Sequence, residues 1–226
     1  MLPFLKTGTR MDLIMEKIAF IWDLDGTLLD SYEIIVTSIY KTYREFGIEL
    51  DKKDIHSEVI TYSVGDFLSK MEKESGIAID TVKSRFSEIN DSEKLNIKLM
   101  KNAAEILQWL KLQGIPNYVF THKGNSAKIV LENTGLYEFF DEIITGKDGF
   151  KRKPDPSAIL YLTKKYDLDK EQTYYVGDRT LDIECANNAG IKSILYLPAD
   201  SVTQKTGKET YIVHDLIDIK DLVFQK

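Results

Sequence analysis

The chain has 226 residues, of which 43% are apolar and 29% charged, so it is long and apolar enough to bury a sizeable core. Its formal net charge is −6 and no basic stripe is evident, which argues against nucleic acid as the main partner. With one cysteine no internal disulfide can form, and no run approaches the roughly 20 apolar residues of a membrane span. We therefore expect a cytoplasmic protein without a membrane partner, as a monomer or weak dimer. Residues 1–15 are expected to be a loosely attached extension.

The first strong element is a short apolar run at residues 18–22, which predicts a buried strand ending at Asp23. Asp30 and Glu33 then have capping-box spacing for a helix that ends before Gly47. Residues 51–98 are rich in charge and have helical spacing, without a convincing strand. From residue 102 onward, helices alternate with short apolar runs that predict strands at 118–120, 142–144, 174–176, 193–196 and 211–213.

This alternation predicts an α/β fold, in which a parallel sheet is covered by helices on both faces. The helical stretch that follows the first strand interrupts the pattern and therefore indicates an inserted domain. We expect a Rossmann-like core from residues 1–30 and 99–226, and a helical cap domain from residues 31–98.

Polar residues follow the predicted strands directly. Ligands of such sheets bind at the carboxyl ends of the strands, so these side chains are expected to converge at one edge. They are Asp23, Asp25, Thr121, Lys153, Asp178 and Asp182.

Four segments in this order resemble the signatures of the haloacid dehalogenase (HAD) superfamily, which consists mostly of phosphatases. They are residues 23–30 (DLDGTLLD), 119–121 (VFT), 153–156 (KPDP) and 176–182 (VGDRTLD). The resemblance implies a phosphatase with a helical cap inserted after the first motif, as in phosphoglycolate phosphatase-like and β-phosphoglucomutase-like enzymes.

The chemistry of these residue types agrees with that resemblance. The carboxylate of Asp23 can attack phosphorus and form an aspartyl-phosphate, which divides one difficult displacement into two easier ones. Asp25 can protonate the leaving oxygen and later deprotonate the attacking water. Clustered carboxylates repel one another and need a cation, and hard oxygen ligands beside a phosphate suit Mg²⁺.

The expected metal ligands are Asp23, Asp178 and the backbone carbonyl of Asp25, with Asp182 close by or acting through water. Thr121 and Lys153 are expected to hold phosphoryl oxygens, where charge develops in the transition state.

Some of these residues also have a structural interpretation. Thr121 could cap the following helix, and Asp182 could belong only to a helix start. His122 occupies a position where the resembling family more often has asparagine, so it either contacts substrate or fills the loop. Cys185, on an apolar helix face, is expected to be buried packing.

The cap implied by the resemblance would close over the site and favour a small phosphorylated metabolite, such as phosphoglycolate or a sugar phosphate. Gly65, in an expected loop at residues 62–66, is the candidate for contact with the leaving group. A phosphomutase of the β-phosphoglucomutase type and a pyrophosphatase stay open as alternatives. A 2-haloacid dehalogenase is disfavoured because that branch lacks the second aspartate, which is Asp25 here. A phospho-accepting receiver domain would be shorter and would lack the inserted helices.

Overall fold

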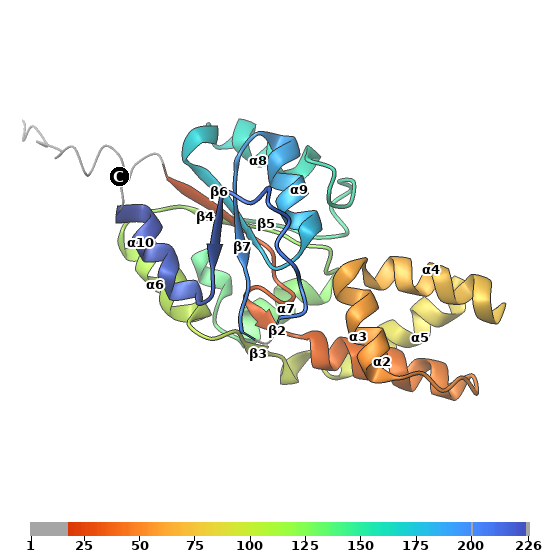
Figure 1. Ribbon diagram of the computed structural model, residues 1–226. Helices are drawn as coiled ribbons and strands as arrows, with labels where there is room; N and C mark the ends of the chain where they lie inside the picture. The colour runs from red at the N-terminus through yellow and green to blue at the C-terminus, as the bar shows by residue number, and fades with distance from the viewer. Residues whose placement is uncertain (1–17, 200, 225–226) are drawn as a thin grey trace, which may run out of the picture.

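The computed structural model describes residues 18–199 and 201–224. Its centre is a parallel sheet in the order β5-β4-β1-β6-β7-β8, with β1 next to the middle (Figure 1). The strands are β1 (Ala19–Trp22), β4 (Asn117–Phe120), β5 (Glu142–Ile144), β6 (Thr173–Gly177), β7 (Lys192–Tyr196) and β8 (Tyr211–Val213). The sequence prediction of a parallel α/β sheet is therefore confirmed, including the edge strand at residues 211–213.

The two faces of the sheet bury separate apolar clusters because side chains alternate along a strand. Phe20 and Trp22 of β1 point into one cluster, and Ala19 and Ile21 into the other. The first cluster is covered by α6 (Ala103–Leu112), α7 (Ser126–Asn133) and α10 (Ile219–Phe224), and the second by α8 (Ser157–Lys165) and α9 (Thr180–Ala189). Cys185 is fully buried in the second cluster, as expected.

Four helices are inserted between β1 and the rest of the sheet, and they project from one side of it (Figure 1). They are α2 (Tyr32–Glu45), α3 (Lys52–Thr61), α4 (Val64–Ser75) and α5 (Ile79–Ser92). These inserted helices bury an apolar cluster of their own around Ile39, Val59 and Leu68. The sequence-based division into residues 1–30 with 99–226, and residues 31–98, stays a prediction.

The two connections to the inserted helices are held together by a short antiparallel pair that the sequence pattern did not reveal. β2 (Leu29–Asp30) pairs with β3 (Lys98–Leu99), and each has only two residues. Such short strands carry no periodicity of their own. The pair brings the entry and exit of the insertion side by side.

The predicted capping box of Asp30 and Glu33 is wrong. Asp30 belongs to β2, and Ser31 is the N-terminal cap residue of α2 without a side-chain capping bond. Its hydroxyl donates instead to Asp25 Oδ1 at 2.7 Å. Farther along the chain, α8 begins at Ser157, with Pro156 as its cap residue.

The expectation that residues 1–15 form an extension lies outside the described residues. Within the described part, none of the helices has the length and apolar character needed to cross a membrane.

A buried hydrogen bond joins β1 to β4 inside the first cluster. Trp22 Nε1 donates to Asn117 Oδ1 at 2.9 Å, and Asn117 Nδ2 donates to the carbonyl of Ile115. Asn117→Leu would leave a buried indole N–H without an acceptor, so we expect the free energy of unfolding to fall by about 1–3 kcal/mol. Urea denaturation measures this change. Asn133→Leu, at an exposed position of α7, is the control, and equal stability of both variants would contradict the prediction.

Candidate active site

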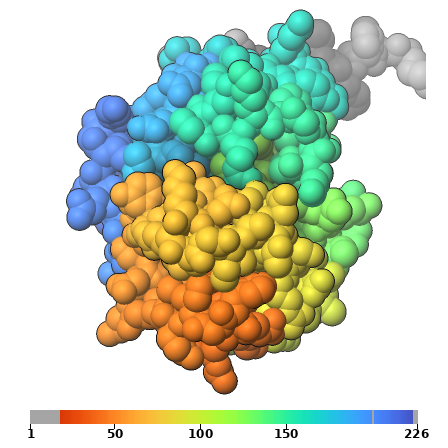
Figure 2. Space-filling view, turned by 90° about the vertical axis from the view of Figure 1, so that its right-hand side faces the viewer, coloured from red at the N-terminus to blue at the C-terminus, as the bar shows by residue number. Residues whose placement is uncertain are grey.

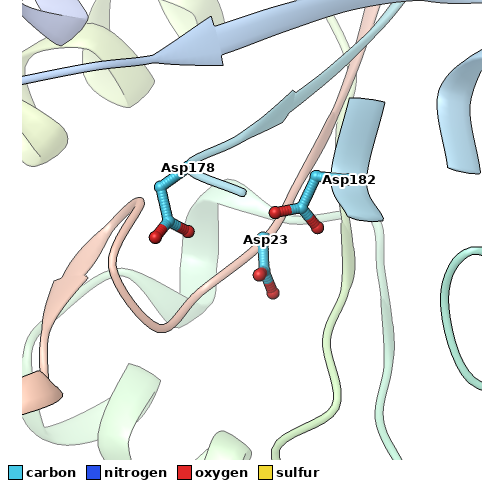
Figure 3. A group of neighbouring side chains, drawn as sticks. All are labelled: Asp23, Asp178 and Asp182. Atoms are coloured by element: carbon cyan, nitrogen blue, oxygen red, sulfur yellow. The ribbon is translucent and has the colours of Figure 1, made fainter. Parts of the chain in front are cut away.

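Three carboxylates converge at the carboxyl ends of the strands (Figure 3). Asp23 follows β1, Asp178 follows β6, and Asp182 lies in the first turn of α9. All three are buried, and one oxygen from each lies within 4.8 Å of the others. Gly177 permits this approach, because a Cβ atom there would collide with the side chain of Asp182.

Asp23 is held rigidly while one of its oxygens stays available. Its backbone N–H donates to the carbonyl of Val176, and its Oδ1 accepts from the N–H of Leu24. The buried Oδ2 accepts no well-oriented hydrogen bond from the described residues. Two cations face that oxygen, with Lys153 Nζ at 2.9 Å and Arg179 Nη2 at 3.6 Å. A nucleophile or metal ligand needs this arrangement, an anionic oxygen that is stabilised but not fully bonded.

Lys153 is the central cation of the cluster. Its Nζ lies 2.6 Å from Asp182 Oδ1 and 3.0 Å from the hydroxyl of Tyr175, in addition to Asp23. Its side chain is completely buried. Burial lowers the pKa of Lys153, but Asp182 and Asp23 outweigh this effect and raise the pKa above its ordinary value. Lys153 is therefore a permanent positive charge at the site.

The pKa values of Asp23 and Asp182 are shifted in opposite directions. Burial alone would raise the pKa of Asp23, but Lys153 and Arg179 hold it below its ordinary value. In Asp182, burial prevails and the pKa is raised despite Lys153. Asp23 is thus the carboxylate best stabilised as an anion.

Asp178 has a different environment. Its Oδ1 accepts from the hydroxyl of Thr27 at 3.1 Å, and its Oδ2 accepts from the hydroxyl of Tyr32 at 2.7 Å. Burial, together with the neighbouring Asp182 and Asp23, raises the pKa of Asp178 to about 7. Tyr32 belongs to α2, so an inserted helix contacts the acid cluster directly.

Asp25 lies beside the group of three rather than within it. Its Oδ1 accepts from Ser31 Oγ at 2.7 Å and from Lys123 Nζ at 2.8 Å. Its side chain is partly exposed. This placement leaves the carboxyl accessible for proton exchange, and a role for its backbone carbonyl as a metal ligand stays a prediction.

Thr121 and His122 directly follow β4, the strand that pairs with β1 on the side away from β6. Thr121 is buried, and its Oγ1 accepts from the N–H of Lys123 at 3.1 Å. His122 Nε2 accepts from the backbone N–H of Lys153 at 2.7 Å. The histidine therefore orients the segment that carries Lys153.

Gly65 lies in helix α4 and not in the expected loop. Residues 64–66 form the first turn of α4 rather than a loop, because Ser63 caps this helix by accepting from the N–H of Asp66. A Cβ atom at Gly65 would meet only Ser63 Oγ, at 3.7 Å. A contact between Gly65 and a leaving group stays a prediction.

The sequence pattern did not reveal several residues of the site, among them Arg179, Lys123 and Tyr32. Arg179 stands inside the fourth motif, and its position beside Asp178 was the available signal. Lys123 follows Thr121 by two residues, but nothing in the sequence paired it with Asp25. Tyr32 had no sequence signal, because only the packing of α2 against the core brings it to Asp178.

A cavity of about 640 Å³ reaches the acid cluster from the junction between the inserted helices and the core. Its lining includes Gly26, Tyr32 and Asp178 beside the acid cluster, and Lys52 and His56 of α3. Both parts of the molecule therefore contribute to the space beside the carboxylates.

The three carboxylates suit a hard divalent cation. They offer anionic oxygens, and oxygens are the ligands that such ions prefer. The two buried cations, Lys153 and Arg179, do not balance three ionised carboxylates by themselves. The residues present could therefore hold a metal ion.

Lys153→Met would remove the charge that balances Asp23 and Asp182. Breaking a buried ion pair strands an uncompensated charge, so we expect a loss of about 3–5 kcal/mol in the free energy of unfolding, measured by urea denaturation with excess chelator. Adding Asp182→Asn should recover part of the loss, because the pair is coupled. Lys151→Met is the matched control at an exposed position. A variant as stable as this control would show that Lys153 does not organise the cluster.

Comparison with known proteins agrees with this geometry. The family model described as "Haloacid dehalogenase-like hydrolase" matches residues 20–196. The phosphoglycolate phosphatase of Aquifex aeolicus is 30% identical over 183 residues, covering 78% of this chain and 83% of that protein. The pyrophosphatase PpaX of Oceanobacillus iheyensis is 26% identical over 207 residues, covering 90% of this chain and 95% of that protein.

Solved structures show the same fold. The crystal structure of a predicted phosphoglycolate phosphatase from Haemophilus somnus superposes with a TM-score of 0.81 at 24% identity, covering 90% of this chain and 96% of that one. The match of the family model runs from β1 to the end of β7 and includes the three clustered carboxylates. The chain therefore belongs to the haloacid dehalogenase-like hydrolases and is an enzyme of that family.

Proposed function

We propose that this chain is a Mg²⁺-dependent phosphatase that hydrolyses a small phosphorylated metabolite through an aspartyl-phosphate. The observation that carries the proposal is the buried Asp23, whose Oδ2 faces Lys153 at 2.9 Å beside two further carboxylates. Relatives named phosphoglycolate phosphatase and pyrophosphatase support a small phosphorylated substrate. Neither a pyrophosphatase nor a phosphomutase conflicts with these core residues.

Asp23, Asp178 and Asp182, with the backbone carbonyl of Asp25, would hold the Mg²⁺. When bound, the ion supplies charge that neutralises the carboxylates and polarises a phosphoryl oxygen. Thr121 and Lys153 donate hydrogen bonds to phosphoryl oxygens, and Arg179 adds a second buried positive charge.

In the first step, the anionic Asp23 attacks phosphorus while the bond from phosphorus to the leaving oxygen breaks. Asp25 donates its proton to that oxygen, so the leaving group departs as a neutral hydroxyl compound. In the second step, Asp25 takes a proton from water as the water attacks phosphorus, and the bond to Asp23 breaks. Phosphate leaves and both aspartates return to their initial states.

The inserted helices act as a cap that selects the leaving group, in contact with the site through Tyr32. Closure over the site favours small substrates and excludes macromolecules, and it removes bulk water from the acyl phosphate. The position of Gly65 at the start of α4 makes it a candidate contact for the leaving group. The proposed setting is a cytoplasmic enzyme acting as a monomer or weak dimer.

Asp23→Asn tests the nucleophile. An amide nearly preserves the shape but does not attack phosphorus, so kcat should fall by roughly a thousandfold or more for every substrate. The measurement is phosphate release with Mg²⁺ over a panel of phosphorylated metabolites. Asp221→Asn, on the exposed side of α10, is the control. If Asp23→Asn keeps about a tenth or more of the activity of the unmodified protein, Asp23 is not the nucleophile.

The raised pKa of Asp178 predicts how the effect of Mg²⁺ depends on pH. The folded protein keeps the proton of Asp178 up to about pH 7, whereas the unfolded chain releases it near the ordinary pKa of 3.8. The stability that the protonated Asp178 contributes is therefore lost as the pH rises between these two values. Mg²⁺ needs the ionised form and must displace the proton at lower pH. The increase in Tm caused by Mg²⁺ should therefore be larger at about pH 8 than at about pH 5.5.

Thermal melts with MgCl₂ and with chelator, at both pH values, measure this difference. Asp178→Asn carries no titrating carboxyl and should lose most of the pH dependence. An equal Mg²⁺ effect at both pH values in the unmodified protein would contradict the prediction.

A further inference from the structure

The hydrogen bond to His122 determines which of its ring nitrogens carries a proton. Nε2 accepts from the backbone N–H of Lys153 at 2.7 Å, and a backbone N–H is only a donor. Nε2 must therefore present its lone pair, and the proton of the neutral ring must be on Nδ1. His122 Nδ1 is a hydrogen-bond donor.

The guanidinium of Arg152 approaches this donor. Arg152 Nη2 lies 3.0 Å from His122 Nδ1, and a guanidinium has donors but no acceptor. Two donors therefore meet without an acceptor, so the contact does not stabilise the loop as a hydrogen bond would. Among residues 18–199 and 201–224, no carboxylate forms an ion pair with Arg152.

The imidazole ring of His122 stays neutral, so protonation does not alter its contact with Arg152. Burial, with the charges of Lys153 and Arg152, lowers the pKa of His122 to about 2, so the ring is neutral near pH 7. A protonated Nε2 would also conflict with the N–H of Lys153. Nδ1 is a donor in the state that the structure requires.

The two donors adjoin the residues proposed to bind the phosphoryl group. His122 directly follows Thr121, and Arg152 directly precedes Lys153, so each adjoins a residue proposed to bind the phosphoryl group. Burial lowers the pKa of Arg152, and the negative charge of Asp66 in α4 opposes this effect. Figure 2 shows the inserted helices, in orange and yellow, lying against the teal part of the core that follows β5. The pair is thus next to the proposed phosphoryl site along the chain and within electrostatic range of an inserted helix.

We infer that His122 Nδ1 and the Arg152 guanidinium form a subsite for an anionic oxygen on the leaving group of the substrate. An oxygen of a carboxylate or of a second phosphoryl group would accept from both donors and replace their repulsion with two hydrogen bonds. Bonds to charged groups are stronger than neutral ones, so the subsite discriminates by charge. The inference rests on the proposed function only in placing the phosphoryl group at Asp23.

Two phosphonates test the subsite without any turnover. Phosphonoacetate and ethylphosphonate share a phosphonate on a two-carbon chain, and they differ in whether that chain ends in a carboxylate or a methyl group. Neither has a bond from phosphorus to a leaving oxygen, so neither can be hydrolysed. Their dissociation constants are measured by titration calorimetry in the presence of Mg²⁺, for the unmodified protein, Arg152→Gln and Lys151→Gln.

Phosphonoacetate should bind the unmodified protein roughly tenfold more tightly than ethylphosphonate, as expected for a charge-assisted hydrogen bond. Arg152→Gln should remove most of this preference and leave the affinity for ethylphosphonate nearly unchanged. Lys151→Gln removes the same charge from the exposed neighbouring residue and should keep the preference. Equal affinities in the unmodified protein, failure of both compounds to bind, or a preference that persists in Arg152→Gln would overturn the inference.

Two hydrolysable esters separate this inference from the proposed function. Phosphoglycolate has a carboxylate on its leaving group, and ethyl phosphate has a methyl group in its place. The kcat/KM for phosphoglycolate should fall about tenfold in Arg152→Gln, with a small change for ethyl phosphate. If neither ester is hydrolysed but phosphonoacetate keeps its Arg152-dependent advantage, the proposed function fails and the subsite stands. If both esters are hydrolysed and Arg152→Gln slows them equally, the subsite fails and the proposed function stands.

Discussion

The ammonium group of Lys153 is the interaction on which the rest of the site depends. It lies 2.9 Å from Asp23 and 2.6 Å from Asp182, with no exposed surface of its own. Buried carboxylates at this spacing would otherwise repel one another or take up protons. Lys153, together with Arg179, holds the pKa of Asp23 below its ordinary value, while burial and the neighbouring acids raise the pKa of Asp178 to about 7. Two buried cations, Lys153 and Arg179, thus favour the anion of Asp23, whereas burial still raises the pKa of Asp182 beside the same lysine.

The sheet supplies the precision that this cluster requires. Asp23 and Asp178 end adjacent parallel strands, so the register of β1 against β6 determines where both carboxylates lie. The backbone N–H of Asp23 continues that pairing by donating to Val176. Alternation along β1 anchors the strand in two apolar clusters, which limits the movement of its last residue. Positioning by rigid elements is what catalysis by preorganised charge needs.

The inserted helices act on the core site through one hydrogen bond and one longer-range electrostatic effect. Tyr32 of α2 donates to Asp178, and Asp66 of α4 acts electrostatically on Arg152. Both interactions relate an inserted helix to a charged group of the core site. A movement of these helices would therefore change the environment of Asp178 and the field around Arg152 together, which offers a physical route from substrate selection to chemistry.

The sequence by itself determined the parallel α/β class, the helical insertion after β1, and the identities of the three clustered aspartates. These features follow from hydrophobic periodicity and from polar residues at strand ends, which are local properties of the chain. It did not determine β2 and β3, the true cap residue of α2, or the partners of Asp178, Asp25 and His122. Tyr32, Lys123 and Arg152 acquire their contacts only when segments far apart in the chain are packed together. Hydrogen-bond partnership and pKa depend on distances of a few ångströms and on burial, and both are decided by the tertiary structure.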